Sequence, residues 1–354
     1  MRVAVIGGGI GGAELVRLAS QYPLDLVLIE PKDQIECQAL YPEYLAGLAK
    51  LDELTAPLKP FCDKVGAELV RDKAVSLGLR GVVCENGEVE YDVAVIATGA
   101  AQNYFGVKGA QKTFSINTFD ETARAKKFLE EMNPERIMII GSGLTGIETA
   151  CVLAESVESS IYIVEMANRV LPQFSESTSK LVENALSRKG VNILTSTRVQ
   201  EISADSILFS NGSTLDCDMA IWTAGIKPSK FIEDLKLPKT KGWITADQYL
   251  RALPGVFAIG DAAWIEIDGK LSTKTAMEAE RHAAHTARNL HKLAEGSALE
   301  KYSVRASTDS QVALISTGCD CAVGVYGKVC MDMPSHLIYS LKSWIDRSFI
   351  KRFK

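Results

Sequence analysis

Two short glycine-rich stretches have the spacing that binds a diphosphate. Residues 7–12, GGGIGG, follow the apolar run 3–6, and residues 141–146, GSGLTG, follow the apolar run 136–140. In such a G-x-G-x-x-G loop, the first glycine makes a tight turn and the second lets the backbone approach a pyrophosphate. The third lets the following helix pack closely on the strand. The free N–H groups and the dipole at the start of that helix then favour the anion.

An acidic residue follows each glycine loop at a fixed interval. Glu30 lies 18 residues beyond Gly12, and Glu165 lies 19 residues beyond Gly146. A carboxylate at this place, the end of the second strand, accepts hydrogen bonds from both hydroxyls of an adenosine ribose. It would repel a 2′-phosphate, so Glu165 predicts a preference for NADH over NADPH. Arg169, four residues further on, is the side chain that would soften this preference.

The elements around the loops repeat in the order strand, glycine loop, helix, strand. The second copy lies about 134 residues after the first, counted from Gly7 to Gly141, and such self-similarity indicates an internal duplication. Further buried strands are expected at 93–97, 220–223 and 256–259, a hairpin at 207–215 and a helix with a seam of small residues at 273–293. These patterns predict an α/β fold with two Rossmann-like dinucleotide-binding domains and a small C-terminal region.

Length and composition narrow the class of protein. The chain has 354 residues, 47% of them hydrophobic and 23% charged, which suits two or three globular domains. The net charge of −5 gives no electrostatic case for nucleic-acid binding. No apolar run is long enough to span a bilayer, and the N-terminus runs directly into the first strand, so a cytoplasmic location is expected. We expect the eight cysteines to be free thiols, and the four histidines predict no metal site.

The last segment, residues 336–354, reverses the sign of the charge. It carries five basic residues against the single acid Asp346, a net charge of +4, among Leu, Ile, Trp and Phe side chains. This composition favours contact with a membrane surface, which would place the protein peripherally on the inner face of the cell membrane. Packing of the segment on the core or on a second subunit, as in a homodimer, is the alternative.

The motifs, taken in order, resemble a known family. GGGIGG (7–12), ATG (97–99), GSGLTGIE (141–148), TAG (223–225) and AIGDAA (258–263) resemble the FAD-dependent pyridine nucleotide-disulfide oxidoreductases, of glutathione-reductase type. Within that superfamily, residues 141–148 and the stretch WTAGIKP (222–228) resemble type II NADH dehydrogenases and apoptosis-inducing-factor-like quinone reductases. The resemblance implies an FAD-binding domain at 1–105 and 229–298, an NAD-binding domain at 106–228, and a C-terminal region at 299–354.

The resemblance also implies the site residues. Thr98 and Gly99 would lie where the chain crosses into the NAD domain, Val75 would offer backbone contacts to adenine, and Asp261 would bind the ribityl chain. Glu148 would orient the nicotinamide, and it is the catalytic candidate. Hydride would pass from NADH to FAD, and the electrons would go on to an acceptor, in this family a quinone. The complete set of expected cofactor-binding residues is Gly7, Gly9, Ile10, Gly11, Gly12, Glu30, Pro31, Lys32, Val75, Thr98, Gly99, Gly260, Asp261 and Ala276 for FAD, and Gly141, Gly143, Leu144, Thr145, Gly146, Glu165 and Gly225 for NADH.

Some residues depart from the type II pattern and leave other functions open. The A-Q-x-x-x-Q-Q stretch that lines the quinone site has Met277, Arg281 and His282 in place of its glutamines, and His282 would face either the flavin or solvent. Cys37 lies where coenzyme A disulfide reductases and some NADH oxidases carry an active cysteine, so a thiol-linked reductase is one alternative. Sulfide oxidation through Cys319 and Cys321 is a second. A third is an NADH-sensing flavoprotein scaffold that alters its partners on reduction.

Overall fold

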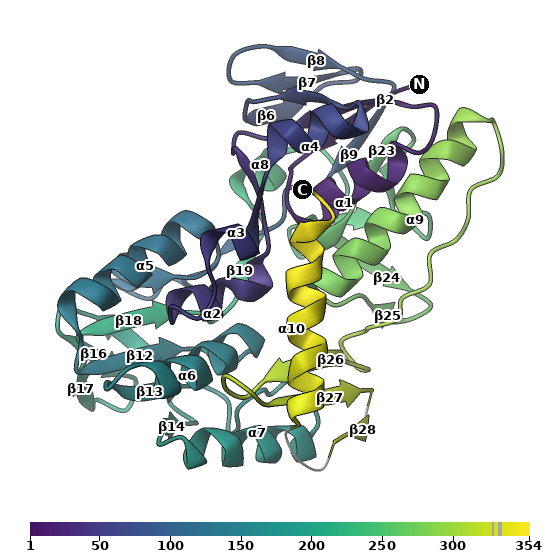
Figure 1. Cartoon of the computed structure of the whole chain (residues 1–354). Coiled ribbons are helices and arrows are strands. Elements are labelled where there is room, and N and C mark those ends of the chain that lie inside the picture. The colour runs from purple at the N-terminus through teal and green to yellow at the C-terminus, as the bar shows by residue number, and fades with distance from the viewer. Residues whose placement is uncertain (328, 332–334) are drawn as a thin grey trace.

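Two parallel β-sheets form the centres of two Rossmann units in a computed structural model of the chain (Figure 1), which describes residues 1–327, 329–331 and 335–354. The sheet of the first unit has the order β22-β23-β9-β1-β2-β5, and the sheet of the second has the order β11-β18-β12-β13-β14. Their strands fall on the two sides of the expected domain boundaries, and the predicted α/β fold with two Rossmann-like units is confirmed.

The central strands of both sheets, β1 and β12, are apolar and buried after their first residue, because helices and loops cover them on both faces. In the first sheet β1 pairs in parallel with β2 and β9, and β22 runs antiparallel at the edge; in the second every pairing is parallel. The bounds of the first set are β1 Arg2–Ile6, β2 Asp25–Ile29, β5 Glu68–Val70, β9 Val93–Ile96, β22 Arg251–Leu253 and β23 Val256–Ala258, and those of the second are β11 Phe114–Ser115, β12 Arg136–Ile140, β13 Ser160–Val164, β14 Asn192–Leu194 and β18 Met219–Trp222.

Helices follow the glycine loops as predicted. In the first unit α1 packs against α9, the predicted small-residue helix, and a methyl group added at Gly11 would lie 3.7 Å from the Cβ of Ala279. The seam of small residues therefore allows a close approach of the two helices. The longer helices are α1 Ile10–Ala19, α4 Leu58–Val65, α5 Phe119–Met132, α6 Leu144–Ser156, α7 Glu176–Arg188 and α9 Ala276–Ala294, and the short ones are η1 Gln38–Leu40, α2 Tyr41–Leu45, α3 Leu51–Leu54, η2 Ala110–Lys112, α8 Lys230–Asp234 and η3 Gly260–Ala262.

Two short strands carry the chain between the units. β10 (Ala101–Gln102) leaves the first unit and pairs antiparallel with β19 (Ile226–Lys227), which returns to it. The predicted hairpin is also present, because β16 pairs antiparallel with β17. The remaining small strands are β3 Gln34–Glu36, β4 Thr55–Pro57, β6 Ala74–Leu77, β7 Gly81–Cys84, β8 Glu88–Glu90, β15 Val199–Ile202, β16 Ser206–Phe209, β17 Thr214–Asp216, β20 Lys239–Thr240, β21 Trp243–Ala246, β24 Ala263–Ile267 and β25 Lys270–Leu271.

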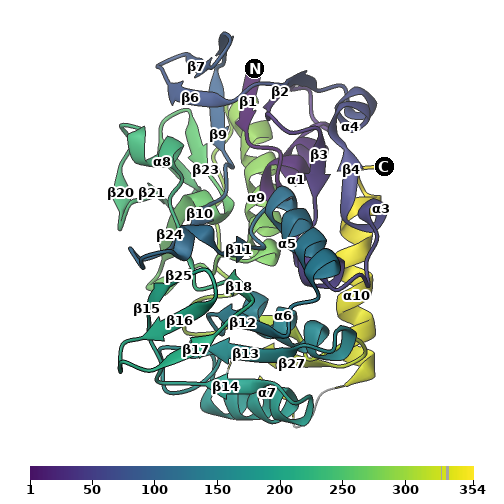
Figure 2. The same ribbon diagram turned by 90° about the vertical axis from the view of Figure 1, so that its left-hand side faces the viewer.

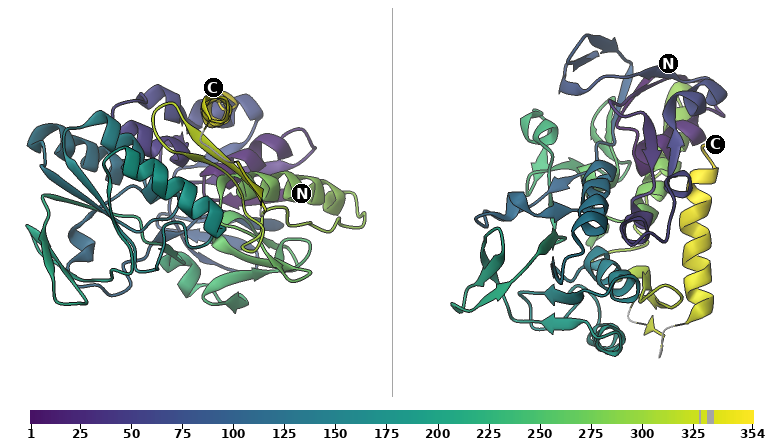
Figure 3. Two further views of the ribbon diagram at one scale, coloured as in Figure 1. Left: turned by 90° about the horizontal axis from the view of Figure 1, so that it is seen from below. Right: turned by 60° about the vertical axis from the view of Figure 1, so that its left-hand side comes forward.

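The C-terminal region forms a small antiparallel sheet and one helix. β26 (Val312–Ser316), β27 (Ala322–Tyr326) and β28 (Val329–Cys330) pair in sequence, and α10 spans His336–Lys351. Figures 2 and 3 show α10 running along one side of both units, from β27 toward α3 and α1. Within the described residues, no helix is both long enough and apolar enough to cross a bilayer.

The basic residues of α10 and the chain end point mostly into the protein, which corrects the charge argument for membrane contact. Lys342 lies 3.4 Å from a carboxylate oxygen of Glu148 in α6, and Arg347 and Arg352 form ion pairs with acids of the first unit. A net charge counted along the segment does not reveal this pairing, because the acidic partners lie up to 338 residues away along the chain. The apolar side chains on the outer face of the helix do remain exposed, with Leu337 at 80% and Trp344 at 68%.

Candidate functional site

The first glycine loop has the geometry that each glycine was expected to provide. Gly7 has φ of 104°, and a Cβ there would lie 2.6 Å from the carbonyl oxygen of Ala97. A Cβ on Gly12 would lie 1.8 Å from the carbonyl oxygen of Gly7, so only glycine permits this contact between helix and strand. A Cβ on Gly9 would meet no atom within 4 Å, which leaves the backbone open to a ligand.

A cavity of about 410 Å³ lies directly over this loop and over the N-terminus of α9. Twelve of the fourteen residues expected to bind FAD line it; Gly12 lies beneath at the helix–strand contact, and Val75 lies just outside, while its neighbours Lys73 and Ala74 line the wall. The lining residues that were expected are Gly7, Gly9, Ile10, Gly11, Glu30, Pro31, Lys32, Thr98, Gly99, Gly260, Asp261 and Ala276. Residues from five separate stretches of sequence therefore meet at one cavity.

Polar groups in this cavity suit a dinucleotide. Glu30 accepts hydrogen bonds from the backbone N–H of Gly8 at 2.6 Å and of Lys32 at 3.0 Å, which fixes its carboxylate at the cavity wall. The Oγ1 atom of Thr98 is buried and has no hydrogen-bond partner within the described part of the chain. An unsatisfied buried hydroxyl that lines a cavity points to a ligand partner. These features fit FAD, with its diphosphate against the open backbone at Gly9.

Lys274 fixes the turn that carries Asp261, and the sequence analysis did not single it out. Its Nζ donates hydrogen bonds to the carbonyl oxygens of Asp261 at 2.7 Å and Ala263 at 2.9 Å, and lies 3.7 Å from the centre of the Trp243 ring. Burial lowers the pKa of Lys274 to about 8, against the opposing charge of Asp261. Burial also raises the pKa of the Asp261 carboxyl. The available signal was the position of Lys274 in the first turn of the helix predicted at 273–293, which also carries the expected FAD-binding residue Ala276.

The second glycine loop repeats the first in detail. Gly141 has φ of 105°, and a Cβ on Gly146 would lie 2.0 Å from the carbonyl oxygen of Gly141, whereas one on Gly143 would meet nothing within 4 Å. Glu165 accepts from the N–H of Ser142 at 3.1 Å and, unlike Glu30, from a side-chain hydroxyl, Ser142 Oγ at 2.7 Å.

The other residues expected at the second loop lie close to it. Leu144 and Thr145 begin α6, immediately after the loop. Gly225 lies just before β19, and its carbonyl oxygen accepts a hydrogen bond from the N–H of Asn103 at 3.0 Å.

Arg169 is turned away from the ribose carboxylate. Its guanidinium donates to the carbonyl oxygens of Pro172 at 2.8 Å and Phe174 at 2.9 Å, and to the hydroxyl of Ser179. These bonds hold the side chain within its own loop. Arg169 is therefore not placed to soften the preference for NADH that Glu165 predicts.

Glu148, the catalytic candidate, is largely covered by the C-terminal region, with 12% of its side chain exposed. Its Oε1 accepts from the backbone N–H of Ser316 in β26 at 3.0 Å and lies 3.4 Å from Nζ of Lys342 in α10. Lys342 also forms an ion pair of 2.8 Å with Asp346. Burial raises the pKa of the Glu148 carboxyl, with Lys342 pulling in the opposite direction. One carboxylate thus joins α6, β26 and α10.

His282 is also buried, which rules out a solvated position. Its Nδ1 accepts from the backbone N–H of Gly260 at 3.2 Å, and Nε2 lies 3.2 Å from Ser272 Oγ. Burial lowers the pKa of His282 to about 3, so the ring is neutral. Its neighbour Arg281 donates to the carbonyl oxygen of Ser303 at 3.3 Å. Two of the residues that replace the glutamines of the type II pattern, Arg281 and His282, thus form hydrogen bonds within the protein.

Cys37 does not reach the cavity. It is 3% exposed, and its Sγ lies 3.5 Å from the backbone carbonyl oxygen of Asp346 in α10. Burial raises the pKa of the Cys37 thiol to about 12. A nucleophilic cysteine needs access and a lowered pKa, and Cys37 has neither. All eight cysteines are free, as expected.

Two glycine-capped helix ends, each beside a carboxylate held at the loop by backbone N–H groups, are typical of enzymes that move hydride between two dinucleotides. The chain belongs to the pyridine nucleotide-disulphide oxidoreductase family, whose sequence profile matches residues 1–286. It is an NADH-dependent oxidoreductase with FAD as cofactor, so both cofactor predictions are confirmed.

Individual relatives agree with this class. The chain is 28% identical over 277 residues to the NADH dehydrogenase-like protein YutJ of Bacillus subtilis, covering 74% of this chain and 76% of that one. It is 23% identical to a type II NADH:quinone oxidoreductase of Haemophilus influenzae, over 85% of this chain and 82% of the other. The solved NAD-dependent persulfide reductase of A. fulgidus has the same fold, with a TM-score of 0.81 and 24% identity. The match covers 92% of this chain but only 63% of the persulfide reductase.

Proposed function

We propose that this protein is an NADH:quinone oxidoreductase, with FAD in the first Rossmann unit and NADH in the second. When bound, FAD supplies the two-electron relay, taking hydride from NADH and passing electrons to the acceptor. The cavity over residues 7–11 and the unsatisfied Thr98 hydroxyl support the place of FAD. The repeated loop at 141–146 supports the place of NADH, and Glu165 favours NADH over NADPH.

The buried pair of Glu148 and Lys342 is the observation that favours a quinone as acceptor. Reduction of a quinone to a quinol takes two electrons and two protons; NADH supplies a hydride, so one further proton comes from solvent for each quinone. A carboxyl group whose pKa is raised by burial carries a proton near neutral pH more readily than an exposed one. After the proton leaves, the ammonium of Lys342, 3.4 Å away, stabilises the carboxylate that remains. The pair therefore suits an acceptor that must be protonated.

The burial of Cys37 supports the same choice. A disulfide or persulfide acceptor would need a thiolate near the flavin, and Cys37 is packed under α10 with a raised pKa. The persulfide in the name of the A. fulgidus reductase is the substrate of that protein and is not transferred to this chain. For this chain no residue on the cavity wall supplies a sulfur atom, among the residues that the structure describes.

Stopped-flow measurement on the purified yellow protein tests the acceptor. We expect NADH to bleach the flavin faster than NADPH, and a water-soluble quinone to reoxidise it faster than a disulfide, a persulfide or oxygen. Glu148→Gln should slow quinone-coupled turnover by roughly 10²-fold, the usual contribution of a positioned proton donor. Glu43→Gln is the matched control, because Glu43 is also buried and paired with α10, through Arg347 at 2.8 Å. Reoxidation that is faster with a disulfide or persulfide than with any quinone would contradict the proposal.

We further propose that α10 touches the membrane in which a quinone dissolves, through its apolar outer face and not through its charges. Leu337, Leu341 and Trp344 lie along this face and are 80%, 46% and 68% exposed. Because most basic side chains of the segment are paired internally, binding to lipid vesicles should depend little on the fraction of anionic lipid. Replacing both Leu341 and Trp344 by Ser should weaken vesicle binding by about tenfold or more, since each buried side chain contributes about 1.5–3 kcal/mol. A protein that stays off vesicles but forms a dimer, lost in the same variant, would assign this face to a second subunit.

A further inference from the structure

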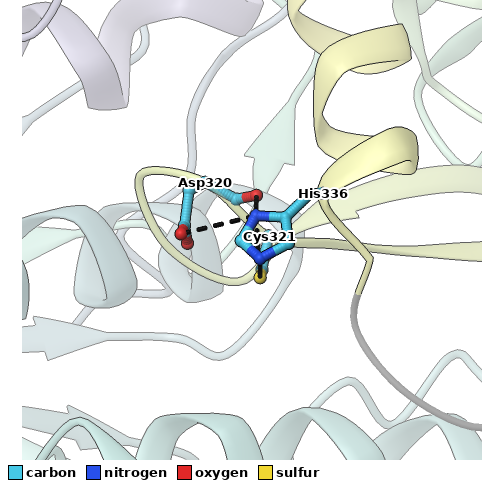
Figure 4. Close-up of side chains that lie close together, drawn as sticks. All are labelled: Asp320, Cys321 and His336. Atoms are coloured by element: carbon cyan, nitrogen blue, oxygen red, sulfur yellow. Dashed lines mark hydrogen bonds and ion pairs between the residues drawn. The ribbon is translucent and has the colours of Figure 1, made fainter.

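Three potential metal ligands meet at the N-terminal end of α10. Asp320 and Cys321 lie in the loop between β26 and β27, and His336 is the first residue of α10 (Figure 4). One ligand atom from each residue lies within 4.8 Å of the other two. The Sγ of Cys321 is 3.8 Å from Nδ1 and 4.0 Å from Nε2 of His336, and a carboxylate oxygen of Asp320 is 3.4 Å from Nδ1.

Backbone pairing holds the two segments that carry these side chains. Ala322 and Ser335 form an isolated antiparallel bridge. The N–H of Ala322 donates to the carbonyl of Ser335 at 3.2 Å, and the N–H of Ser335 donates back at 2.8 Å. Because Cys321 and His336 are the next residues outward from this bridge, their Cα positions are fixed relative to each other. The cluster is therefore set by the fold and not only by the reach of exposed side chains.

The chemistry of the three groups suits a borderline divalent cation. A thiolate, an imidazole nitrogen and a carboxylate are the ligands that Zn²⁺ uses, at about 2.0–2.3 Å, so tetrahedral ligand atoms lie roughly 3.3–3.6 Å apart. The Nε2 atom of His336 lies 4.0 Å from Sγ of Cys321, and the three ligand atoms all lie within 4.8 Å of one another, so a bound cation would draw them somewhat closer together. The Nδ1 of His336 also lies 2.8 Å from the backbone carbonyl oxygen of Asp320. A hydrogen bond from Nδ1–H to that carbonyl leaves the lone pair on Nε2 free for a metal, the arrangement usual for metal-binding histidines.

We propose that Asp320, Cys321 and His336 bind one Zn²⁺-class cation, with water in the fourth position. The metal joins the β26–β27 loop to the start of α10. Cys319, two residues before Cys321, is not part of the set, because its backbone and side chain are engaged by Glu155 of α6. Since α10 carries Lys342 to Glu148, bound metal holds in place the helix on which the buried ion pair depends.

Zinc titration of the untagged, flavin-loaded protein after treatment with a chelator tests this site. We expect one equivalent to bind, with Cys321→Ser and His336→Gln each lowering the affinity at least tenfold. Cys330→Ser is the matched control, since Cys330 is another partly exposed thiol of the same small sheet, and it should bind zinc as the parent protein does. Co²⁺ in place of Zn²⁺ gives the long-wavelength bands of a tetrahedral thiolate site, which lie beyond the flavin absorption and should vanish in Cys321→Ser. Equal zinc affinity in the parent and in Cys321→Ser, or no stoichiometric binding, would overturn the proposal.

Discussion

The two Rossmann units share one loop design, but the lysines that lie beside an acid of each unit have pKa values shifted in opposite directions. In the first unit, Lys274 donates to two backbone carbonyls and its pKa falls to about 8. At the second, Lys342 of α10 lies beside Glu148 of α6; burial opposes the charge of Lys342, yet Glu148 and Asp346 raise its pKa above the ordinary value. Carbonyl groups do not titrate, whereas carboxylates do.

The difference lies in what each lysine bonds to directly. The ammonium of Lys274 donates to carbonyl groups, whose dipoles do not change with pH, while the charge of Asp261 acts on it from nearby; this suits a turn around a cofactor that stays bound. Lys342 is paired with carboxylates, so its interactions change when Glu148 gains or loses a proton, which suits a site where substrates exchange. Substitutions at the two lysines and in the two loops test this difference.

Equivalent glycine substitutions should produce different failures in the two units. Gly12→Ala places a Cβ 1.8 Å from the carbonyl oxygen of Gly7, and Gly146→Ala places one 2.0 Å from that of Gly141. We expect Gly12→Ala to give protein without flavin, and Gly146→Ala to give yellow protein that NADH reduces at least 10²-fold more slowly, because the loop must shift from its diphosphate. Absorbance of the purified protein and stopped-flow bleaching measure the two effects. Gly146→Ala protein that lacks flavin would show that the units are not separable in this way.

Lys342→Met should destabilise the protein and move its pH profile. An unpaired buried carboxylate costs about 3–5 kcal/mol, which denaturant unfolding measures. The ammonium of Lys342 favours the ionised form of Glu148, so its removal raises the pKa of Glu148 further. If the protonated form of Glu148 supplies the proton, the pH at which quinone-coupled turnover falls off should move upward. Arg347→Met breaks the ion pairs of α10 with Glu43 and Glu53. It should lower stability without moving the pH at which turnover falls off. Identical pH profiles for the two variants would count against a role of Lys342 at Glu148.

Lys274→Met should loosen the flavin by roughly tenfold, since hydrogen bonds to a charged group contribute about 1.5–3 kcal/mol. Stability gives an independent readout. The folded pKa of Lys274, about 8, is lower than its unfolded value near 10.4. The unfolded chain therefore binds more protons between these pH values, and the parent protein gains stability as pH rises through this window. Lys274→Met should lack this gain. If stability rises with pH as steeply in the variant as in the parent protein, the amine of Lys274 is not buried against the two carbonyl groups as described above.

Cys37→Ser should have the smallest effect. We expect turnover with quinone to stay within about twofold, with a modest loss of stability, because the thiol is buried against α10 and acts as a small apolar group. Loss of turnover with retained bleaching by NADH would instead support the thiol-linked alternative.

The sequence predicted features that depend on neighbours along the chain. Each glycine loop, its strand, its helix and its acid lie within about 30 residues, and all fall where the pattern placed them. The prediction from the charge of residues 336–354 was wrong in its reasoning, because Lys342 and Arg352 pair with acids of distant segments. The grouping of His336 with Asp320 and Cys321 was missed for a related reason: a backbone bridge brings them together across a gap of 15 residues.

Val75 shows a finer limit of prediction. The resemblance implied backbone contacts from Val75 to adenine; its neighbours Lys73 and Ala74 line the cavity, and Val75 is 41% exposed. The contact of Val75 with adenine stays a prediction, because a contact made by the backbone does not depend on the direction of the side chain.

The paired strands β10 and β19 carry the chain from the first Rossmann unit to the second and back, within the described residues 1–327. The C-terminal segment lies along both units and forms ion pairs with each, through Lys342 of α10 with the second unit and through Arg352, at the end of α10, with the first. We expect the last nineteen residues of the sequence to restrict how the two nucleotide sites move relative to each other. Removing these residues should release that restraint without touching either nucleotide loop.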